Sequence, residues 1–118
     1  MRKKVTNKKV TEKEIENAIL DYLTLCPGEF WRNNSVGVFD PVKKTFRRPS
    51  RYHRNGVSDI LGILPCGTFV AIEVKKPTGK LSENQKLFIS DINKCNGIAF
   101  VARSVDDVRE RLHGQARD

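Results

Sequence analysis

The sequence has few cysteines and no long apolar run. The basic start, Met1 to Lys4, is not followed by an apolar stretch, so it lacks the form of a signal peptide, and no segment is long enough to span a membrane. The three cysteines, Cys26, Cys66 and Cys95, lie far apart and form no Cys/His cluster, which excludes the common zinc motifs. Scattered reduced thiols are typical of the cytoplasm, where we expect this protein to reside.

Acidic residues are the minority among the charged ones. The 118 residues include 22 Lys and Arg against 14 Asp and Glu, which gives a net charge of +8. A chain of this length can form one domain with a real core and has no room for a second. The positive excess favours a polyanionic partner, with nucleic acid as the first candidate, although solubility or anionic lipid would also account for it.

The apolar pattern predicts an α/β fold in the order helix, three strands, helix, strand, helix. Residues 1–10 are expected to be a flexible basic arm, 11–113 a single domain and 114–118 a charged tail. Thr11 and Ser82 each precede an acid or amide by three residues, Glu14 and Gln85, which is the pattern of a capping box at a helix start. We expect helices over 12–25, 83–94 and from 105, and strands over 30–39, 57–64, 69–75 and 98–102.

Three charged residues, Asp59, Glu73 and Lys75, interrupt apolar segments that have the pattern of a β-hairpin. Side chains alternate along a strand, so Glu73 and Lys75 share a face, and Asp59 can lie beside Glu73 on the adjacent strand. Buried charge is costly unless it is paired or binds a metal. Two carboxylates and the carbonyl of Val74 suit Mg²⁺, and a protonated lysine can orient the attacking water or stabilise developing charge. The pattern therefore predicts a phosphodiester-cleaving site; the alternative is a surface pair of Glu73 and Lys75.

No acidic residue occurs between positions 43 and 54. Basic side chains neutralise phosphates, and aromatic rings such as Phe46 and Tyr52 can stack on exposed bases, so the segment is expected to bind nucleic acid. The alternative is a solvated, mobile loop. His53 has no neighbouring Cys or His partner, and we expect a DNA or structural contact from it rather than zinc binding. The candidate nucleic-acid-binding residues are Lys43, Lys44, Arg47, Arg48, Arg51, Tyr52, His53 and Arg54.

Four segments of the chain resemble the VRR-NUC domain of the PD-(D/E)XK nuclease superfamily. They are residues 56–62 (GVSDILG), 71–75 (AIEVK), 81–85 (LSENQ) and 97–102 (GIAFVA), and the likeness extends from Thr11 to Val108. The resemblance, to the short stand-alone form in particular, implies a restriction-endonuclease-like core, a mixed β-sheet flanked by helices in the order αβββαβα. It also implies the cytoplasm of a bacterium or of a phage-infected host.

The same resemblance implies a set of site residues. Asp59 and Glu73 would bind the metal, Lys75 would be the catalytic lysine, and Gln85 would be a further active-site residue on the following helix. The capping box offers Gln85 a structural role as well, and the two roles do not exclude each other.

The family also places a glutamate on the first helix. Glu12 fits best, because it stands three residues before the apolar Ile15, whereas Glu14 is explained by the helix cap. Glu16, one turn later on the same face, remains the alternative. The ordinary explanation for Glu12 is a favourable interaction with the helix dipole.

As a function, the resemblance implies a Mg²⁺-dependent endonuclease, with Mn²⁺ able to substitute, that cuts branched DNA such as four-way (Holliday) junctions as a homodimer. Phe30 and Trp31 are candidates for the dimer surface, or else belong to the core. The alternatives are a non-catalytic DNA-binding accessory module, a general nuclease and an RNA nuclease. A sequence-specific restriction endonuclease is disfavoured, since no separate recognition domain is evident.

Overall fold

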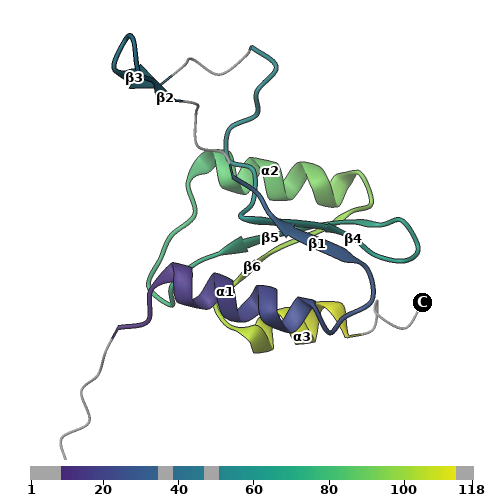
Figure 1. Ribbon diagram of the computed structural model, residues 1–118. Helices are drawn as coiled ribbons and strands as arrows, with labels where there is room; N and C mark the ends of the chain where they lie inside the picture. The colour runs from purple at the N-terminus through teal and green to yellow at the C-terminus, as the bar shows by residue number, and fades with distance from the viewer. Residues whose placement is uncertain (1–8, 35–38, 47–50, 114–118) are drawn as a thin grey trace, which may run out of the picture.

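The computed structural model describes residues 9–34, 39–46 and 51–113 (Figure 1). The predicted arm, apart from its last two residues, and the tail lie outside these ranges. The elements in chain order are α1 (Glu12–Leu23), β1 (Glu29–Arg32), β2 (Phe39–Asp40), β3 (Thr45–Phe46), β4 (Ile60–Ile63), β5 (Phe69–Val74), α2 (Glu83–Lys94), β6 (Ile98–Ala102) and α3 (Val105–Leu112). Within the described residues, no helix has the length and apolar character needed to cross a membrane.

Four strands form one mixed sheet in the order β1-β4-β5-β6. β1, β4 and β5 pair antiparallel, and the predicted hairpin between β4 and β5 is confirmed, closed by a hydrogen bond from Leu64 N to Thr68 O. β6 pairs parallel to β5, because α2 carries the chain across the sheet between them. The sheet with its helices has the order αβββαβα, so the predicted fold class is confirmed.

The helices lie in two layers: α1 and α3 on one face of the sheet and α2 on the other (Figure 1). Side chains along β5 point alternately towards the two helix layers. Val70, Ile72 and Val74 belong to the core beneath α1 and α3, whereas Ala71 packs with Phe88 of α2. Glu73 shares the α2 face with Ala71, so its carboxylate is held inside the protein rather than on a solvated face.

Helix starts and the last strand match the sequence prediction. Thr11, Ser82 and Ser104 cap the three helices, and β6 covers the predicted residues 98–102. The first helix ends two residues early, at Leu23, since the chain turns before Pro27 and Gly28.

Two predicted strands were too long. The strand expected over 30–39 ends at Arg32, and Phe39 belongs instead to a separate hairpin, β2–β3, which stands away from the body in Figure 1. The strand expected from Val57 begins at Ile60. Both errors have one cause: the chain before Ile60 turns onto α2, so β1 has no partner strand beyond the Arg32–Ile60 pair.

Candidate active site

Asp59 stands at the junction of three strands, directly before β4. Its carboxylate oxygen Oδ2 accepts a hydrogen bond from Val74 N at 2.8 Å. Its carbonyl accepts one from Asn33 N at 2.7 Å. Strands β1 and β5 therefore both fix the position of Asp59, and one carboxylate oxygen is committed to the backbone beside Glu73.

Gly56 lets this segment lie against the start of α2. Its φ is +81°, and a Cβ at this position would come within 2.4 Å of Asn84 O and 2.7 Å of Gln85 N. Any larger residue would push the segment away from the helix. The loop that carries Asp59 and the helix turn that carries Gln85 are therefore packed backbone to backbone.

Glu73 is the buried carboxylate of the site, with only 2% of its surface exposed. Burial raises the pKa of Glu73 to about 9, helped by a hydrogen bond with Asp59 and its negative charge; Lys75 lowers the pKa and Glu12 raises it. Asp59, Lys75 and Glu12 are thus close enough to Glu73 to act on its carboxyl group. Among the described residues, no group donates a hydrogen bond to Glu73 Oε1.

Gln85 takes part in the capping box of α2 and also contacts Glu73, so it makes the structural contact and the active-site contact that the sequence suggested. Its Oε1 accepts a hydrogen bond from Ser82 N at 2.9 Å, while Ser82 Oγ accepts from Gln85 N, so the capping box is confirmed. This fixes the amide orientation and points Nε2 at Glu73 Oε2, 3.4 Å away. The helix cap therefore positions the amide donor against the buried carboxylate.

The two glutamates of α1 differ in their partners. Glu16 Oε1 lies 3.3 Å from Arg32 Nε, in an ion pair with β1. Glu12, one turn earlier, acts on Glu73 and lies near Gly79, where a Cβ would be 3.4 Å from Glu12 Oε2. The geometry therefore favours Glu12 over Glu16 as the acid of the first helix.

The turn after β5 is supported by Arg103, a residue the sequence did not single out. Its Nη1 donates to the carbonyls of Lys76 (2.5 Å), Pro77 (3.3 Å) and Gly79 (2.9 Å). The Cβ position of Gly79 lies 3.4 Å from Lys75 Cδ as well as near Glu12. Arg103 thus holds the turn that adjoins both side chains.

The oxygen groups of the site fit a hard divalent cation. Among the described residues, no group of three or more His, Cys, Asp or Glu side chains is placed to hold a metal ion by itself. Mg²⁺, however, typically takes one or two protein carboxylates and completes its shell with water. Asp59 and Glu73 supply two carboxylates, and Glu73 Oε1 is a buried acceptor without a donor. A cation there would replace the proton that the metal-free Glu73 retains.

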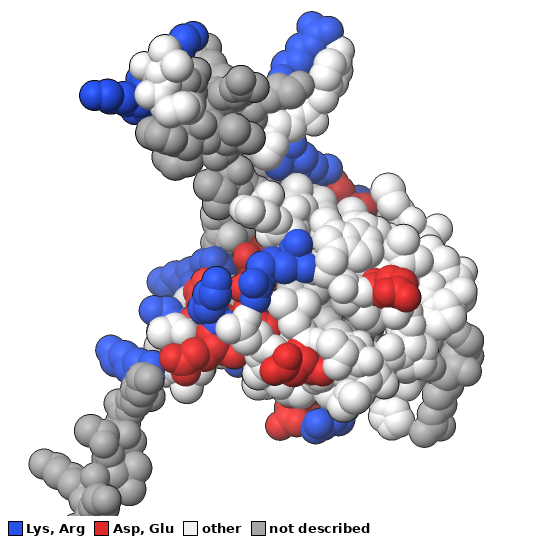
Figure 2. Space-filling model, in the orientation of Figure 1, with Lys and Arg blue, Asp and Glu red and all other residues white. Residues whose placement is uncertain are grey.

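The predicted nucleic-acid-binding residues extend from the projecting hairpin to α2. Lys43 and Lys44 lie between β2 and β3, and Arg51 donates to the hydroxyl of Tyr52 at 2.6 Å. Arg54 instead pairs with Asp91 of α2. Figure 2 shows the blue side chains mainly on the projection and around the start of α1, with acidic ones among them, while the opposite side is mostly uncharged. Arg47, Arg48 and the side chain of Phe46 lie outside what is described.

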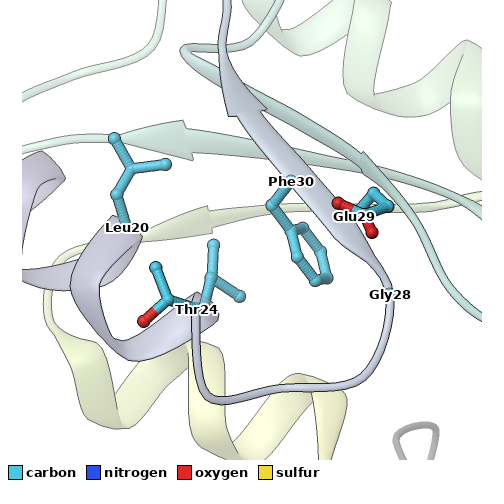
Figure 3. Close-up of a pocket in the computed structure, with 6 residues that line it drawn as sticks. Leu20, Thr24, Gly28, Glu29 and Phe30 are labelled. Carbon is cyan, nitrogen blue, oxygen red and sulfur yellow. The ribbon is translucent and has the colours of Figure 1, made fainter.

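A cavity of about 380 Å³ lies at the other end of α1 (Figure 3). Leu20 and Leu23 line it from the helix, and Thr24, Gly28, Glu29 and Phe30 line it from the following turn and β1. Phe30 packs against the core beneath α1. Of the two roles considered for it, dimer surface or core, the structure therefore supports the core. The cavity contains none of the site carboxylates.

Comparison with known proteins identifies relatives of this fold. The model of the VRR-NUC domain family matches residues 8–106. A solved structure named "VRR_NUC domain protein" has a TM-score of 0.63 and 17% identity, over 92% of this chain and 89% of its own. At this identity the likeness shows a shared fold. A search of curated proteins finds no match.

Proposed function

Because this chain belongs to the VRR-NUC domain family, a family of nucleases that act on DNA, we propose that it is a Mg²⁺-dependent endonuclease, with Mn²⁺ able to substitute. The observation that carries the proposal is the buried Glu73 carboxylate. It lies beside a second carboxylate, Asp59, and has one oxygen without a donor. Burying one acid beside another is unfavourable for folding alone, whereas a bound cation offsets it.

Each residue of the site has a distinct proposed role. Asp59, Glu73 and the Val74 carbonyl would hold the metal, with Glu12 adding negative charge from α1. Mg²⁺ at this position supplies charge stabilisation of the phosphate and a more acidic bound water. Lys75 would donate hydrogen bonds to the attacking water or to the phosphate oxygens as charge develops. Gln85 would orient the Glu73 carboxylate through its Nε2.

For the substrate we propose branched DNA, such as a four-way junction, cut by a homodimer. Two features support a dimer. Trp31 on the edge strand β1 is 44% exposed, although tryptophan is usually largely buried, and Ile63 of β4 is also exposed. One site cuts one strand, so a two-fold dimer is the simplest way to make paired cuts in a symmetric junction.

The test is cleavage of linear, flap, four-way-junction and RNA substrates in Mg²⁺ and in EDTA. We expect Mg²⁺-dependent cuts near the branch, and a loss of at least about 100-fold in Lys75→Ala. Lys94→Ala, an exposed lysine at the end of α2, is the matched control and should cut normally. Cleavage in EDTA would exclude the metal mechanism. Binding in Ca²⁺ without cleavage of any substrate in Mg²⁺ would instead indicate a non-catalytic DNA-binding module.

A further inference from the structure

A second cavity, of about 480 Å³, lies between the segment after β3 and the first turns of α2. Its volume is within the range of small-molecule sites, roughly 300–1,000 Å³. In Figure 1 the trace from residue 51 onwards returns to the body beside α2. The lining residues are Tyr52, His53, Arg54, Asn55, Asn84, Leu87 and Asp91.

Two charged groups of the lining, Arg54 and Asp91, neutralise each other. Arg54 Nη2 lies 2.6 Å from Asp91 Oδ2, and its guanidinium carbon lies 5.2 Å from the centroid of the Phe88 ring. Arg54 therefore joins the segment to α2 and forms a wall of the cavity. With its charge paired, this wall has less attraction for a phosphate than a free arginine would have.

The rest of the lining suits a flat, uncharged ring with polar edges. Tyr52 is 80% exposed and Leu87 55% exposed, so both offer apolar surface to solvent, and the Arg51 guanidinium carbon lies 4.8 Å from the centroid of the Tyr52 ring. Asn55 and Asn84 are exposed amides, which can both donate and accept hydrogen bonds. A nucleobase has this combination of an apolar face and a hydrogen-bonding edge.

The cavity adjoins the candidate active site through two of its lining residues, Asn55 and Asn84. Asn84 precedes Gln85, whose Nε2 faces Glu73. Asn55 precedes Gly56, whose backbone touches Asn84 and Gln85. A nucleotide held here would thus be a near neighbour of the phosphate at the catalytic carboxylates.

We propose that this cavity receives one unpaired nucleobase of the substrate strand, next to the phosphate that is cut. The inference rests on the proposed nuclease function and deepens it. A base within a duplex is stacked and paired, whereas a base at a branch point or in a single strand can leave the stack at little cost. Selection for branched or unpaired DNA would then reside in a base pocket of one protomer, and would not require the dimer.

The test is fluorescence anisotropy in EDTA, where no metal-dependent cleavage occurs. The probes are a short single-stranded oligodeoxynucleotide, an abasic strand of the same length and a duplex. The wild type should bind the intact strand about tenfold tighter than the abasic strand, which has the phosphates but no bases. Tyr52→Ala and Leu87→Ala should bring this ratio close to one, mainly by weakening the binding of the intact strand. Tyr52→Phe keeps the ring and should keep the ratio.

The possible failures are distinguishable. A wild type that binds the intact and abasic strands equally, or a Tyr52→Ala variant that keeps the full ratio, would overturn the base pocket while DNA binding stands. If Tyr52→Ala lowered the affinity for the intact and the abasic strand equally, the ring would contact the DNA backbone. That result would also overturn the base pocket. Failure to bind any of the three probes would overturn the pocket, whereas the proposed function is tested separately by cleavage in Mg²⁺.

Discussion

Replacing Glu73 by glutamine should stabilise the metal-free protein. The pKa of Glu73 rises from an ordinary 4.5 to about 9, chiefly because the carboxyl is buried and lies beside Asp59. Between these values the folded protein binds a proton that the unfolded chain has lost. The contribution of Glu73 to stability is thus complete below about pH 4.5 and is lost as the pH rises towards 9.

The size of the effect follows from the same two values. Near pH 7, ionisation favours the unfolded chain by about 3 kcal/mol, at about 1.4 kcal/mol for each pH unit above 4.5, while the folded protein gains almost nothing. Glutamine has no such ionisation, and its carbonyl can still accept the hydrogen bond from Gln85 Nε2. Glu73→Gln should therefore be more stable than the wild type by up to about 3 kcal/mol at pH 7, with little difference near pH 4.

The assay is denaturant unfolding in EDTA between about pH 4 and pH 8, where the pH changes the ionisation of Glu73 in the unfolded chain. Titrating groups common to the two proteins contribute equally to both, so their effect cancels in the difference between the two free energies of unfolding. Glu110→Gln, an exposed glutamate of α3, is the matched control for the substitution. Added Mg²⁺ should stabilise the wild type and not Glu73→Gln, because the ligand carboxylate is gone. Wild-type and Glu73→Gln stabilities that run parallel over the whole pH range would refute the assignment of Glu73 as a buried, protonated acid.

Three further predictions concern other parts of the molecule. Arg103→Ala should lower kcat by about tenfold with little change in KM, because the turn beside Lys75 loses its three hydrogen bonds. Arg103→Lys should recover part of the lost kcat, and an unchanged kcat in Arg103→Ala would contradict a positioning role. Neutralising Arg47, Arg48 and Arg51 together should weaken binding to all DNA sequences and reduce the salt slope by about 3, measured by titration at several salt concentrations; an unchanged slope would show that these residues do not contact phosphates. Light scattering should give the mass of a dimer, reduced to that of a monomer by Trp31→Arg, and a wild-type monomer at assay concentration would exclude the dimer.

Much of the fold could be predicted from local signals. The start of α2 and the whole of β6 were found because a capping box and an apolar run each mark their own ends. The limits of β1 and β4 depend instead on distant contacts. Gly56 packs against α2, which takes the segment before Asp59 away from β1, although the apolar pattern of the predicted strand begins at Val57.

The candidate site shows the same division. Asp59, Glu73 and Lys75 were conspicuous because each is a charge in an apolar segment. The sequence favoured Glu12 and left Glu16 as the alternative, since the two share a helix face, and in the structure Glu16 forms an ion pair with Arg32 on β1. Arg103 gave no signal, because its partners are main-chain carbonyls more than twenty residues earlier in the chain.

Two residues of the site use one atom of the side chain for a structural contact and another atom for the proposed chemistry. Gln85 caps α2 with Oε1 and faces Glu73 with Nε2, and Asp59 accepts from Val74 N with Oδ2, which leaves Oδ1 for other ligands. Alanine at either position therefore removes a structural contact together with the proposed catalytic one, and lost activity alone does not separate them. Lys75 is different: its described side-chain neighbours are the site charges and the Gly79 turn. Loss of cleavage in Lys75→Ala with unchanged stability is thus the result that most directly assigns chemistry to this site.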